Sequence, residues 1–260
     1  MIEREPPLLT LERLTKLYGR KVALRNVSLD LWAGEVLGIV GESGSGKTTL
    51  LNCMNGTLTP TSGAILYRTR HTGVVDVTTM SEAHKRLLMR TDWGIVHQHP
   101  RDGLRMGVSA GANVGERLMA VGARHYGFIR SQALGWLNRV EIDVDRIDDR
   151  PGVFSGGMQQ RLQIARNLVN EPRLVFMDEP TGGLDVSVQA RLLDLLRALV
   201  QELQLAAIIV THDLAVARVL AHRLFVMRRG EIVESGLTDQ VLDDPQHPYT
   251  QLLVSSILQV

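Results

Sequence analysis

The chain has 260 residues, of which 44% are hydrophobic and 22% are charged, ordinary values for a globular protein with a sizeable core. Its 29 lysines and arginines nearly balance 28 acids, and the net charge of +1 gives no reason to expect nucleic acid as a partner. One cysteine, Cys53, excludes an internal disulfide and is expected to pack. Met1–Pro7 has no signal-peptide core and no apolar run reaches the ~18 residues that span a bilayer, so we expect a cytoplasmic protein.

Short apolar segments separated by turns predict strands in the first part of the chain. Residues 8–31 are expected to form edge strands that meet a core sheet. The next elements are expected to be a strand at 35–40, a helix from Thr49, a strand at Ala64–Tyr67, a helix at Ser81–Arg90 and a strand at Gly94–Gln98.

From residue 98 to about 153 apolar residues recur at helical spacing, which predicts a helical insert. Helices and short buried strands then alternate, which predicts an α/β fold with a largely parallel sheet. The helices are expected at Met158–Val169, Val186–Leu203, Asp213–Leu220 and after Pro248, and the strands at Leu174–Met177, Ala207–Val210, Leu224–Met227 and Glu231–Val233.

Residues 41–48 fit the phosphate-loop template G-x-x-x-x-G-K-[ST] between a predicted strand and a predicted helix. The glycines let successive N–H groups point at one anion, and the helix adds its N-terminal donors. Lys47 supplies a charge for the β- and γ-phosphates, and Thr48 supplies a hydroxyl ligand for Mg²⁺. The predicted nucleotide-binding residues of this segment are Gly41, Glu42, Ser43, Gly44, Ser45, Gly46, Lys47, Thr48 and Thr49.

The predicted strand Leu174–Met177 ends in two acids, Asp178 and Glu179. An aspartate at this place in phosphate-loop enzymes helps to hold Mg²⁺. The glutamate beside it can polarise the attacking water as a general base. A solvated acidic turn is the alternative interpretation, and the phosphate loop upstream makes it the less favoured one.

A second anion-binding element is predicted at Ser155-Gly156-Gly157, where Ser155 is a natural N-cap of the next helix. Two glycines give an anion close access to backbone N–H groups, and the helix dipole favours it. Ser155-Gly156-Gly157 shortly before the acidic strand, with the phosphate loop far upstream, resembles the ABC ATPases. Here Phe154 replaces the usual leucine, Met158 precedes Gln159, and Gly182-Gly183-Leu184-Asp185 lacks the common Ser-Ala.

The resemblance implies a phosphate-loop NTPase core of the ABC ATPase type, with an antiparallel β subdomain and a helical insert. The core with its β subdomain would take residues 1–97 and 154–240, the helical subdomain 98–153 and a helical tail 241–260. It also implies ATP and Mg²⁺ as cofactors. The partner would be a second ABC ATPase domain, the same or a related chain, in a head-to-tail sandwich.

Individual roles follow from the same resemblance. Tyr18 stands where the family stacks an aromatic on adenine, and Gln98 where it has a metal- and water-sensing glutamine. Asp185 matches the loop that communicates across the dimer, and His212 matches the switch histidine on the γ-phosphate. The resemblance therefore implies Glu179, His212 and Gln98 as catalytic residues, Thr48, Gln98 and Asp178 as metal ligands, and Tyr18, Ser155, Gly156, Gly157, Gln159 and Asp185 as further nucleotide-binding residues. A packed strand residue at position 18 and a helix-end residue at 212 are the alternatives.

Two subfamily resemblances remain open. The C-terminal run 244–253, which contains His-Pro-Tyr-Thr, resembles the oligopeptide and dipeptide importer ATPases. Segments 93–100, 115–120 and 122–127 resemble the ATP-binding K subunits of phosphonate carbon–phosphorus lyase systems. The latter implies an ATPase on soluble lyase-core subunits; the former implies a motor on a membrane permease. A third hypothesis is a nucleotide-gated binding module whose hydrolysis is incidental.

The family resemblance implies that the polar segment after the strand at 94–98 is the place of partner contact. We expect His97, His99, Arg101 and Arg105 to help form a docking face, and a solvated polar loop is an equally favoured alternative. His97 and His99 lack nearby ligands at metal-site spacing, so a metal site there is disfavoured.

Overall fold

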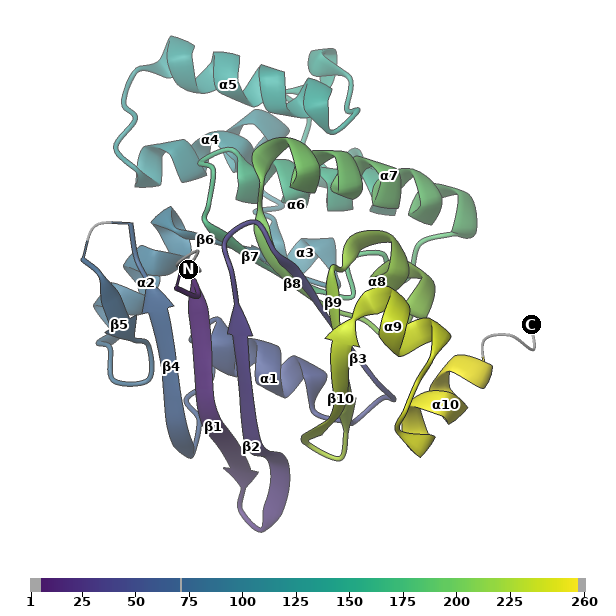
Figure 1. Cartoon of the computed structure of the whole chain (residues 1–260). Helices are drawn as coiled ribbons and strands as arrows, with labels where there is room; N and C mark the ends of the chain where they lie inside the picture. The colour runs from purple at the N-terminus through teal and green to yellow at the C-terminus, as the bar shows by residue number, and fades with distance from the viewer. Residues whose placement is uncertain (1–5, 71, 257–260) are drawn as a thin grey trace, which may run out of the picture. The chain divides into compact units, whose positions relative to one another are not determined.

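The computed structural model describes residues 6–70 and 72–256 (Figure 1). It divides into a first unit, which comprises the residues up to Lys85 and those from Gln204 onward, and a second unit, Arg86–Leu203. The first five residues of the segment examined for a signal peptide, and the last four of the predicted tail, lie outside the described residues. The domain boundaries expected from the sequence stay a prediction.

The first unit contains an antiparallel sheet in the order β2-β1-β4-β5, with β1 at Leu9–Tyr18, β2 at Lys21–Leu31, β4 at Ser62–Arg68 and β5 at Val74–Asp76. Figure 1 shows β1, β2 and β4 side by side. The expectation that residues 8–31 meet the core sheet as edge strands is wrong for β1, whereas β2 lies at the edge of this antiparallel sheet. Because β1 pairs with β2 on one side and β4 on the other, it is a central strand with its ladder satisfied within this sheet.

The phosphate-loop segment follows a parallel strand of the same unit. Strand β3 (Val36–Val40) pairs in parallel with β8 (Ala206–Val210) and with β9 (Arg223–Arg228), and β10 (Glu231–Leu237) pairs antiparallel with β9. All five residues of β3 are buried, as expected for a strand of a parallel sheet. Helix α1 (Lys47–Met54) follows β3, and helix α8 (Leu214–Leu220) follows β8. The loops that lead into these helices therefore lie at the carboxyl ends of two parallel strands.

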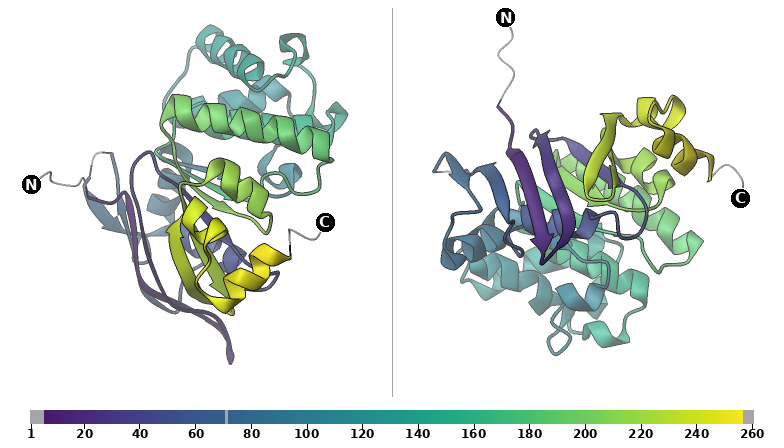
Figure 2. Two further views of the ribbon diagram at one scale, coloured as in Figure 1. Left: turned by 45° about the vertical axis from the view of Figure 1, so that its right-hand side comes forward. Right: turned by 90° about the horizontal axis from the view of Figure 1, so that it is seen from below.

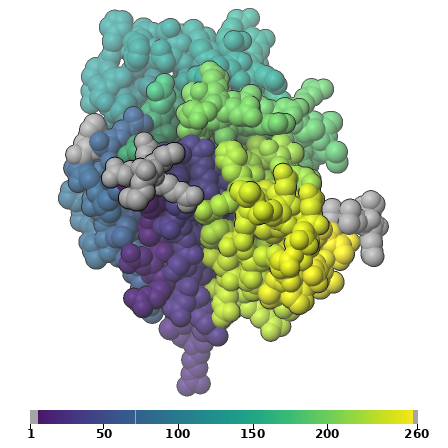
Figure 3. Space-filling model, viewed as in Figure 1, coloured from purple at the N-terminus to yellow at the C-terminus, as the bar shows by residue number. Residues whose placement is uncertain are grey.

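The last two elements of the first unit are short helices, α9 (Thr238–Asp243) and α10 (Pro248–Ser255). They lie beside β9 and β10 in both views of Figure 2, and Figure 3 shows them as a yellow block against the yellow-green strands. Tyr249 of α10 and Leu242 of α9 belong to one buried cluster with Val40 and Val226. The helix predicted after Pro248 is confirmed, and its apolar face is buried on the end of β3.

The second unit pairs β6 (Trp93–Val96) in parallel with β7 (Leu174–Asp178). The predicted helices of the insert are present as α3 (Pro100–Gly103), α4 (Ala110–Ala120) and α5 (Tyr126–Arg139), with 3-10 turns at Val144–Arg146 and Pro151–Val153. Helix α6 (Gly156–Leu168) begins two residues before its predicted start, and α7 has the predicted bounds, Val186–Leu203. Helix α2 (Glu82–Thr91) runs across the boundary between the units.

Cys53 packs in α1, as expected, with 1% of its surface exposed. Burial raises the pKa of its thiol from 9.0 to about 11, and the charge of Lys16 opposes this shift. We therefore expect native protein at pH 8 to react with iodoacetamide about 100-fold more slowly than urea-unfolded protein, because the thiolate is the nucleophile. Since the chain has one cysteine, mass spectrometry reads this site alone. Equal rates in both states would contradict the burial of the thiol.

Candidate functional site

Residues 41–46 connect β3 to α1 and pass close to the backbone of two other strands. Gly41 has φ +148°, and a Cβ there would lie 2.2 Å from the carbonyl oxygen of Met227 on β9. Gly46 has φ +109°, and its Cβ would lie 2.7 Å from the carbonyl oxygen of Ala23 on β2. Both the backbone angle and the lack of space therefore require glycine at these two template positions.

Polar groups inside this loop fit an anion. Lys47 is 7% exposed, and its Nζ donates to the carbonyl oxygens of Gly41 at 2.8 Å and Glu42 at 3.0 Å. The buried Ser45 Oγ has no hydrogen-bond partner among the described residues. A buried hydroxyl without a partner is rare, and a phosphate oxygen would satisfy it. Glu42, Ser43, Gly44 and Thr48 are exposed, and Thr49 is half-buried.

His212 lies at the same edge of the sheet as the phosphate loop. Val210 is paired with Ile39, and the N–H of Thr211 donates to the carbonyl oxygen of Ile39 at 3.1 Å. The exposed His212 therefore follows β8 where Gly41 follows β3. Its neighbour Asp213 caps α8 and accepts from the N–H of Ala215 at 2.8 Å, so the segment that carries His212 is held in place.

Tyr18 ends β1 and is 49% exposed. It pairs with Lys21, the first residue of β2, and Ala23 of β2 is the residue that touches Gly46. The Nζ of Lys16 lies 5.3 Å from the centre of the tyrosine ring. Strand β2 thus links the exposed aromatic ring of Tyr18 to the phosphate loop, which lies at the same sheet edge as His212.

Glu179 and Gln98 of the second unit approach the same turn at Gly182. Asp178 ends β7, and Glu179 follows with φ +44°, a conformation that costs a non-glycine residue about 1 kcal/mol. The N–H of Gly182 donates to the carbonyl oxygen of Glu179 at 2.8 Å. A Cβ at Gly182 would lie 3.3 Å from Nε2 of Gln98 and 3.4 Å from Cβ of Glu179. The side-chain amide of Gln98 and the Cβ of Glu179 therefore both lie close to Gly182.

Ser155 caps α6 as predicted, because its Oγ accepts from the N–H of Met158 at 3.3 Å. Ser155 and Gly156 are exposed, whereas a Cβ at Gly157 would lie 2.5 Å from Val188 of α7. Gln159 is buried, and its Nε2 donates to the carbonyl oxygens of Pro151 and Phe154. Its side chain thus holds the segment before α6; its predicted contact with nucleotide stays a prediction.

Asp185 caps α7. Its Oδ1 accepts from the hydroxyl of Ser187 at 2.8 Å and from the N–H of Val188 at 3.0 Å. The backbone hydrogen bond from Val188 and the side-chain bond from Ser187 lower the pKa of Asp185. The carboxylate is therefore charged at neutral pH and stabilises the first turn of the helix.

A row of buried amides on α6, which we call the amide row, was missed in the sequence; it comprises Gln159, Gln160, Gln163 and Asn167. Gln163 accepts from the N–H of His97 at 2.7 Å and donates to its carbonyl at 3.1 Å. Gln160 donates to the carbonyl of Pro180 at 2.9 Å and accepts from Gln163 at 3.0 Å. The row thereby holds the residues before Gln98 and after Glu179. Its signal in the sequence is the run of uncharged amides at helical spacing.

No group of three or more His, Cys, Asp or Glu that could hold a metal ion occurs in residues 6–70 and 72–256. The predicted Mg²⁺ ligands are a hydroxyl, an amide and one carboxylate, and their role stays a prediction. Burial lowers the pKa of the His97 imidazole, and the negative charges of Asp102 and Asp178 oppose this shift. His97 is therefore neutral at pH 7.

The predicted docking residues differ in their exposure. Arg101 and His99 are exposed. Arg105 forms an ion pair with Glu116 at 3.3 Å, and the backbone of His97 is held by the amide row. Their role in docking stays a prediction.

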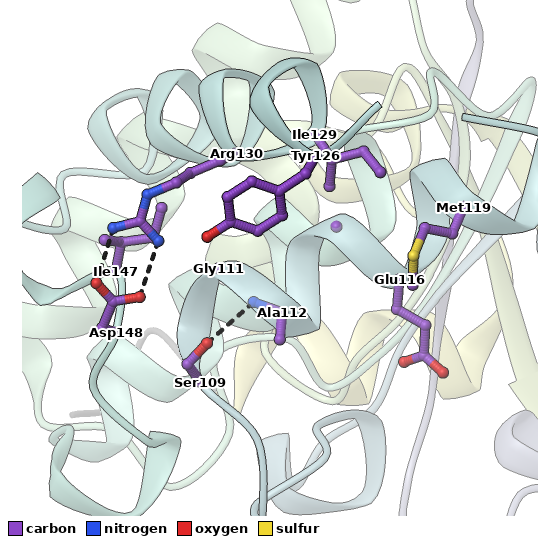
Figure 4. Close-up of a pocket in the computed structure, with 11 residues that line it drawn as sticks. Ser109, Gly111, Ala112, Glu116, Met119, Tyr126, Ile129, Arg130, Ile147 and Asp148 are labelled. Atoms are coloured by element: carbon purple, nitrogen blue, oxygen red, sulfur yellow. Dashed lines mark hydrogen bonds and ion pairs between the residues drawn. The ribbon is translucent and has the colours of Figure 1, made fainter. Parts of the chain in front are cut away.

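A separate cavity of about 230 Å³ lies between α4 and α5 and contains none of the predicted site residues (Figure 4). Tyr126 and Arg130 of α5 line it, and Arg130 makes a bidentate pair with Asp148 at 2.7 and 2.8 Å. Gly111 and Gly115 of α4 form part of its wall, and the cavity is therefore a feature of the helical packing.

Comparison with known proteins settles the family. A family model described as ABC transporter matches residues 24–182. The chain belongs to this family. It is an ABC ATPase, which binds and hydrolyses ATP, and its α/β architecture with a phosphate loop is the family's fold.

Relatives of this ABC ATPase are named either for phosphonate utilization or for import. It is 68% identical over 253 residues to PhnK of Escherichia coli (strain K12), described as a phosphonates utilization ATP-binding protein, covering 97% of this chain and 98% of the relative. It is 38% identical over 257 residues to the glutathione import ATP-binding protein GsiA of Salmonella typhimurium, covering 93% of this chain and 40% of the relative.

Solved structures of the family include dimers. The ATP-binding cassette MJ0796, a dimer with ADP and phosphate in a post-hydrolysis state, is 31% identical, with a TM-score of 0.78 over 88% of this chain and 98% of that chain. CbiO1 of Clostridium perfringens is 29% identical, with a TM-score of 0.79 over 98% of this chain and 96% of that chain. In this ABC ATPase, no helix of the described residues is long and apolar enough to cross a membrane.

Replacing Gln163 with methionine should lower the free energy of unfolding by about 1–3 kcal/mol, because the N–H and carbonyl of His97 lose their partner inside the protein. Methionine keeps the length of the side chain but neither donates nor accepts at these positions. Denaturant unfolding measures the change. The matched control is Gln132→Met on α5, where the side chain is half-buried and has no hydrogen bond within the described residues. Equal effects of the two substitutions would show that the amide row contributes no specific stability.

Proposed function

We propose that the chain is the ATP-hydrolysing subunit of a soluble phosphonate-degrading carbon–phosphorus lyase complex in the cytoplasm, where it drives or gates conformational change. The observation that carries this proposal is the 68% identity to the phosphonates utilization protein PhnK over nearly the whole of both chains. The assignment of the subunit to a lyase core, and of its place in the cell, goes beyond that identity.

In this proposal the phosphate loop binds the phosphates of ATP through Lys47 and the N–H groups of residues 41–49. Thr48, Asp178 and Gln98 hold Mg²⁺, which neutralises phosphate charge when bound. Tyr18 stacks on the adenine, for which its exposed ring is suited. The buried hydroxyl of Ser45 and the buried ammonium of Lys47 support the loop as the anion site.

Glu179 takes the proton of the attacking water as general base, and His212 donates a hydrogen bond to the γ-phosphate. The turn at Gly182 supports this assignment, because the Cβ of Glu179 and the amide of Gln98, a proposed metal ligand, both lie close to this glycine. The positive φ of Glu179 supports it as well, since strained backbone persists where the surroundings over-determine it.

Two such domains, of this chain or of this chain and a related ATPase, form the head-to-tail dimer in which Ser155, Gly156 and Gly157 bind the nucleotide of the partner. The exposure of Ser155 and Gly156 at the start of a capped 13-residue helix supports this role. The dimers formed by MJ0796 support it independently. Gln159 supports the signature segment, and Asp185 communicates across the dimer.

Replacing Glu179 with glutamine should lower ATP turnover by at least about 100-fold, because the amide cannot accept the proton of water. The affinity for ATP should change by less than about twofold, since the phosphate loop is untouched. Phosphate release and binding of a fluorescent ATP analogue measure the two effects. Glu171→Gln is the matched control, a glutamate of the same unit that also has positive φ, at +50°. Retained turnover in the Glu179→Gln variant would contradict the role of Glu179 as general base.

A cleft of about 250 Å³ in the second unit supports docking on an acidic surface. It is lined by four arginines and one aspartate, together with His97 and further residues; the charged ones are Arg86, Arg90, Arg117, Arg166 and Asp102. Burial, then the neighbouring Arg166, lowers the pKa of Arg117 to about 10, with Glu116 opposing. Arg86 and Arg90 are exposed one turn apart on α2 and form no ion pair within the described residues. Two positive charges at this spacing repel each other and destabilise the helix slightly. Carboxylates of a partner would offset this repulsion by pairing with the two arginines.

Reversing both charges, Arg86→Glu with Arg90→Glu, should lower co-purification of lyase-core subunits by at least about tenfold, because like charges repel at an interface. ATP binding should be unchanged. Arg191→Glu with Arg197→Glu, on the exposed side of α7, is the matched control. Co-purification that survives the first pair as well as the second would remove the cleft from the docking face.

The alternative is an importer motor that docks on a membrane permease. It is favoured by the 38% identity to the glutathione import protein GsiA and by the C-terminal His-Pro-Tyr-Thr run. A pull-down of the Glu179→Gln protein with ATP and Mg²⁺, from soluble and membrane fractions, separates the two. Lyase-core subunits would support the lyase complex, and an integral-membrane permease would replace it with the importer.

A further inference from the structure

The C-terminal helix α10 touches the phosphate loop through one hydroxyl group. The N–H of Glu42 donates to Oη of Tyr249 at 2.9 Å, across 207 residues of sequence. Both residues belong to the first unit. Glu42 is the second residue of the phosphate-loop template, so the contact is to the backbone of the loop itself.

The same peptide group carries a second bond. The N–H of Glu42 and the carbonyl of Gly41 belong to one peptide plane, in which they point in opposite directions. Tyr249 holds the N–H, while Nζ of Lys47 donates to the carbonyl at 2.8 Å. A rotation of this plane would therefore break both bonds. The hydroxyl of Tyr249 thus fixes the direction of a carbonyl that accepts from the Lys47 ammonium.

Tyr249 is itself held from several sides. It is 7% exposed and packs in the buried cluster with Val40 and Leu242, and the guanidinium of Arg228 lies 4.8 Å from its ring centre. Its N–H donates to Nδ1 of His247, which caps α10. A side chain fixed in this way can orient a loop, whereas a mobile one would lose entropy for each bond.

The preceding turn is anchored by a carboxylate. Glu234 of β10 accepts from the N–H of Gln246 at 2.7 Å and from the N–H of His247 at 3.0 Å. Charge-assisted bonds of this kind are among the stronger ones in proteins. The start of α10 is therefore tied to the sheet on which the phosphate loop is built.

We propose that Tyr249 is a positioning residue for nucleotide binding, which orients the Gly41–Glu42 peptide and through it Lys47. This rests on the proposed binding of ATP phosphates by the loop. The C-terminal Pro248–Ser255 segment then acts on nucleotide binding through the backbone of the phosphate loop.

Tyr249→Phe tests the proposal, because it removes the hydroxyl and keeps the ring that packs in the cluster. We expect the amide of Glu42 to exchange with deuterium faster. We expect the dissociation constant and the KM for ATP to rise about two- to tenfold, the effect of one hydrogen bond, with kcat within about twofold of the wild type. Tyr126→Phe on the exposed side of α5 is the matched control and should change none of these.

Three results separate the possibilities. Faster exchange at Glu42 with unchanged ATP affinity would overturn the role in binding and leave Tyr249 as a packing residue. Unchanged exchange and unchanged affinity would overturn the hydrogen bond as well. If the wild-type protein bound no ATP, the proposed nucleotide site would fail, whereas the exchange of the Glu42 amide would still report on the tyrosine contact. A thermal unfolding curve that matches the wild type excludes general loosening as the cause of a positive result.

Discussion

The ammonium group of Lys47 is buried and is held by two carbonyl oxygens of its own loop. A buried charge is costly unless it is hydrogen-bonded, so the loop has to keep these carbonyls turned inward. That requirement explains the positive φ of Gly41 and the close approach of Met227 to it. The parallel strands β3 and β9 and the helix α10 all contribute groups that keep the loop in this shape.

In the second unit, uncharged amide side chains hold the backbone of the proposed site residues. The amide row on α6 meets the backbone of the segments that carry Gln98 and Glu179, and Gln159 meets the segment before Ser155. An amide both donates and accepts, so one uncharged side chain satisfies an N–H and a carbonyl together. Because one helix holds these segments, a displacement of α6 would move the proposed metal ligand, the proposed base and the signature segment together.

The two units thus contribute different chemistry to the ABC ATPase. The first contains the proposed anion site, an exposed aromatic residue at the end of β1 and a histidine after β8. The second supplies the acids, the glutamine, the signature residues and an arginine-lined cleft. Preorganised donors raise affinity and rate because they need no rearrangement when charge arrives.

Local pattern was enough for the elements whose interactions are local. The phosphate loop, the acidic end of β7 and the bounds of α7 follow from spacing, glycine placement and apolar periodicity in the sequence. The partners of β1 did not follow, because strand pairing depends on residues far along the chain, such as those of β4. The amide row has the polar composition of a solvated face, and only the packed structure shows it to be buried. The contact of Tyr249 with Glu42 joins residues at opposite ends of the sequence, and tertiary packing alone decides it.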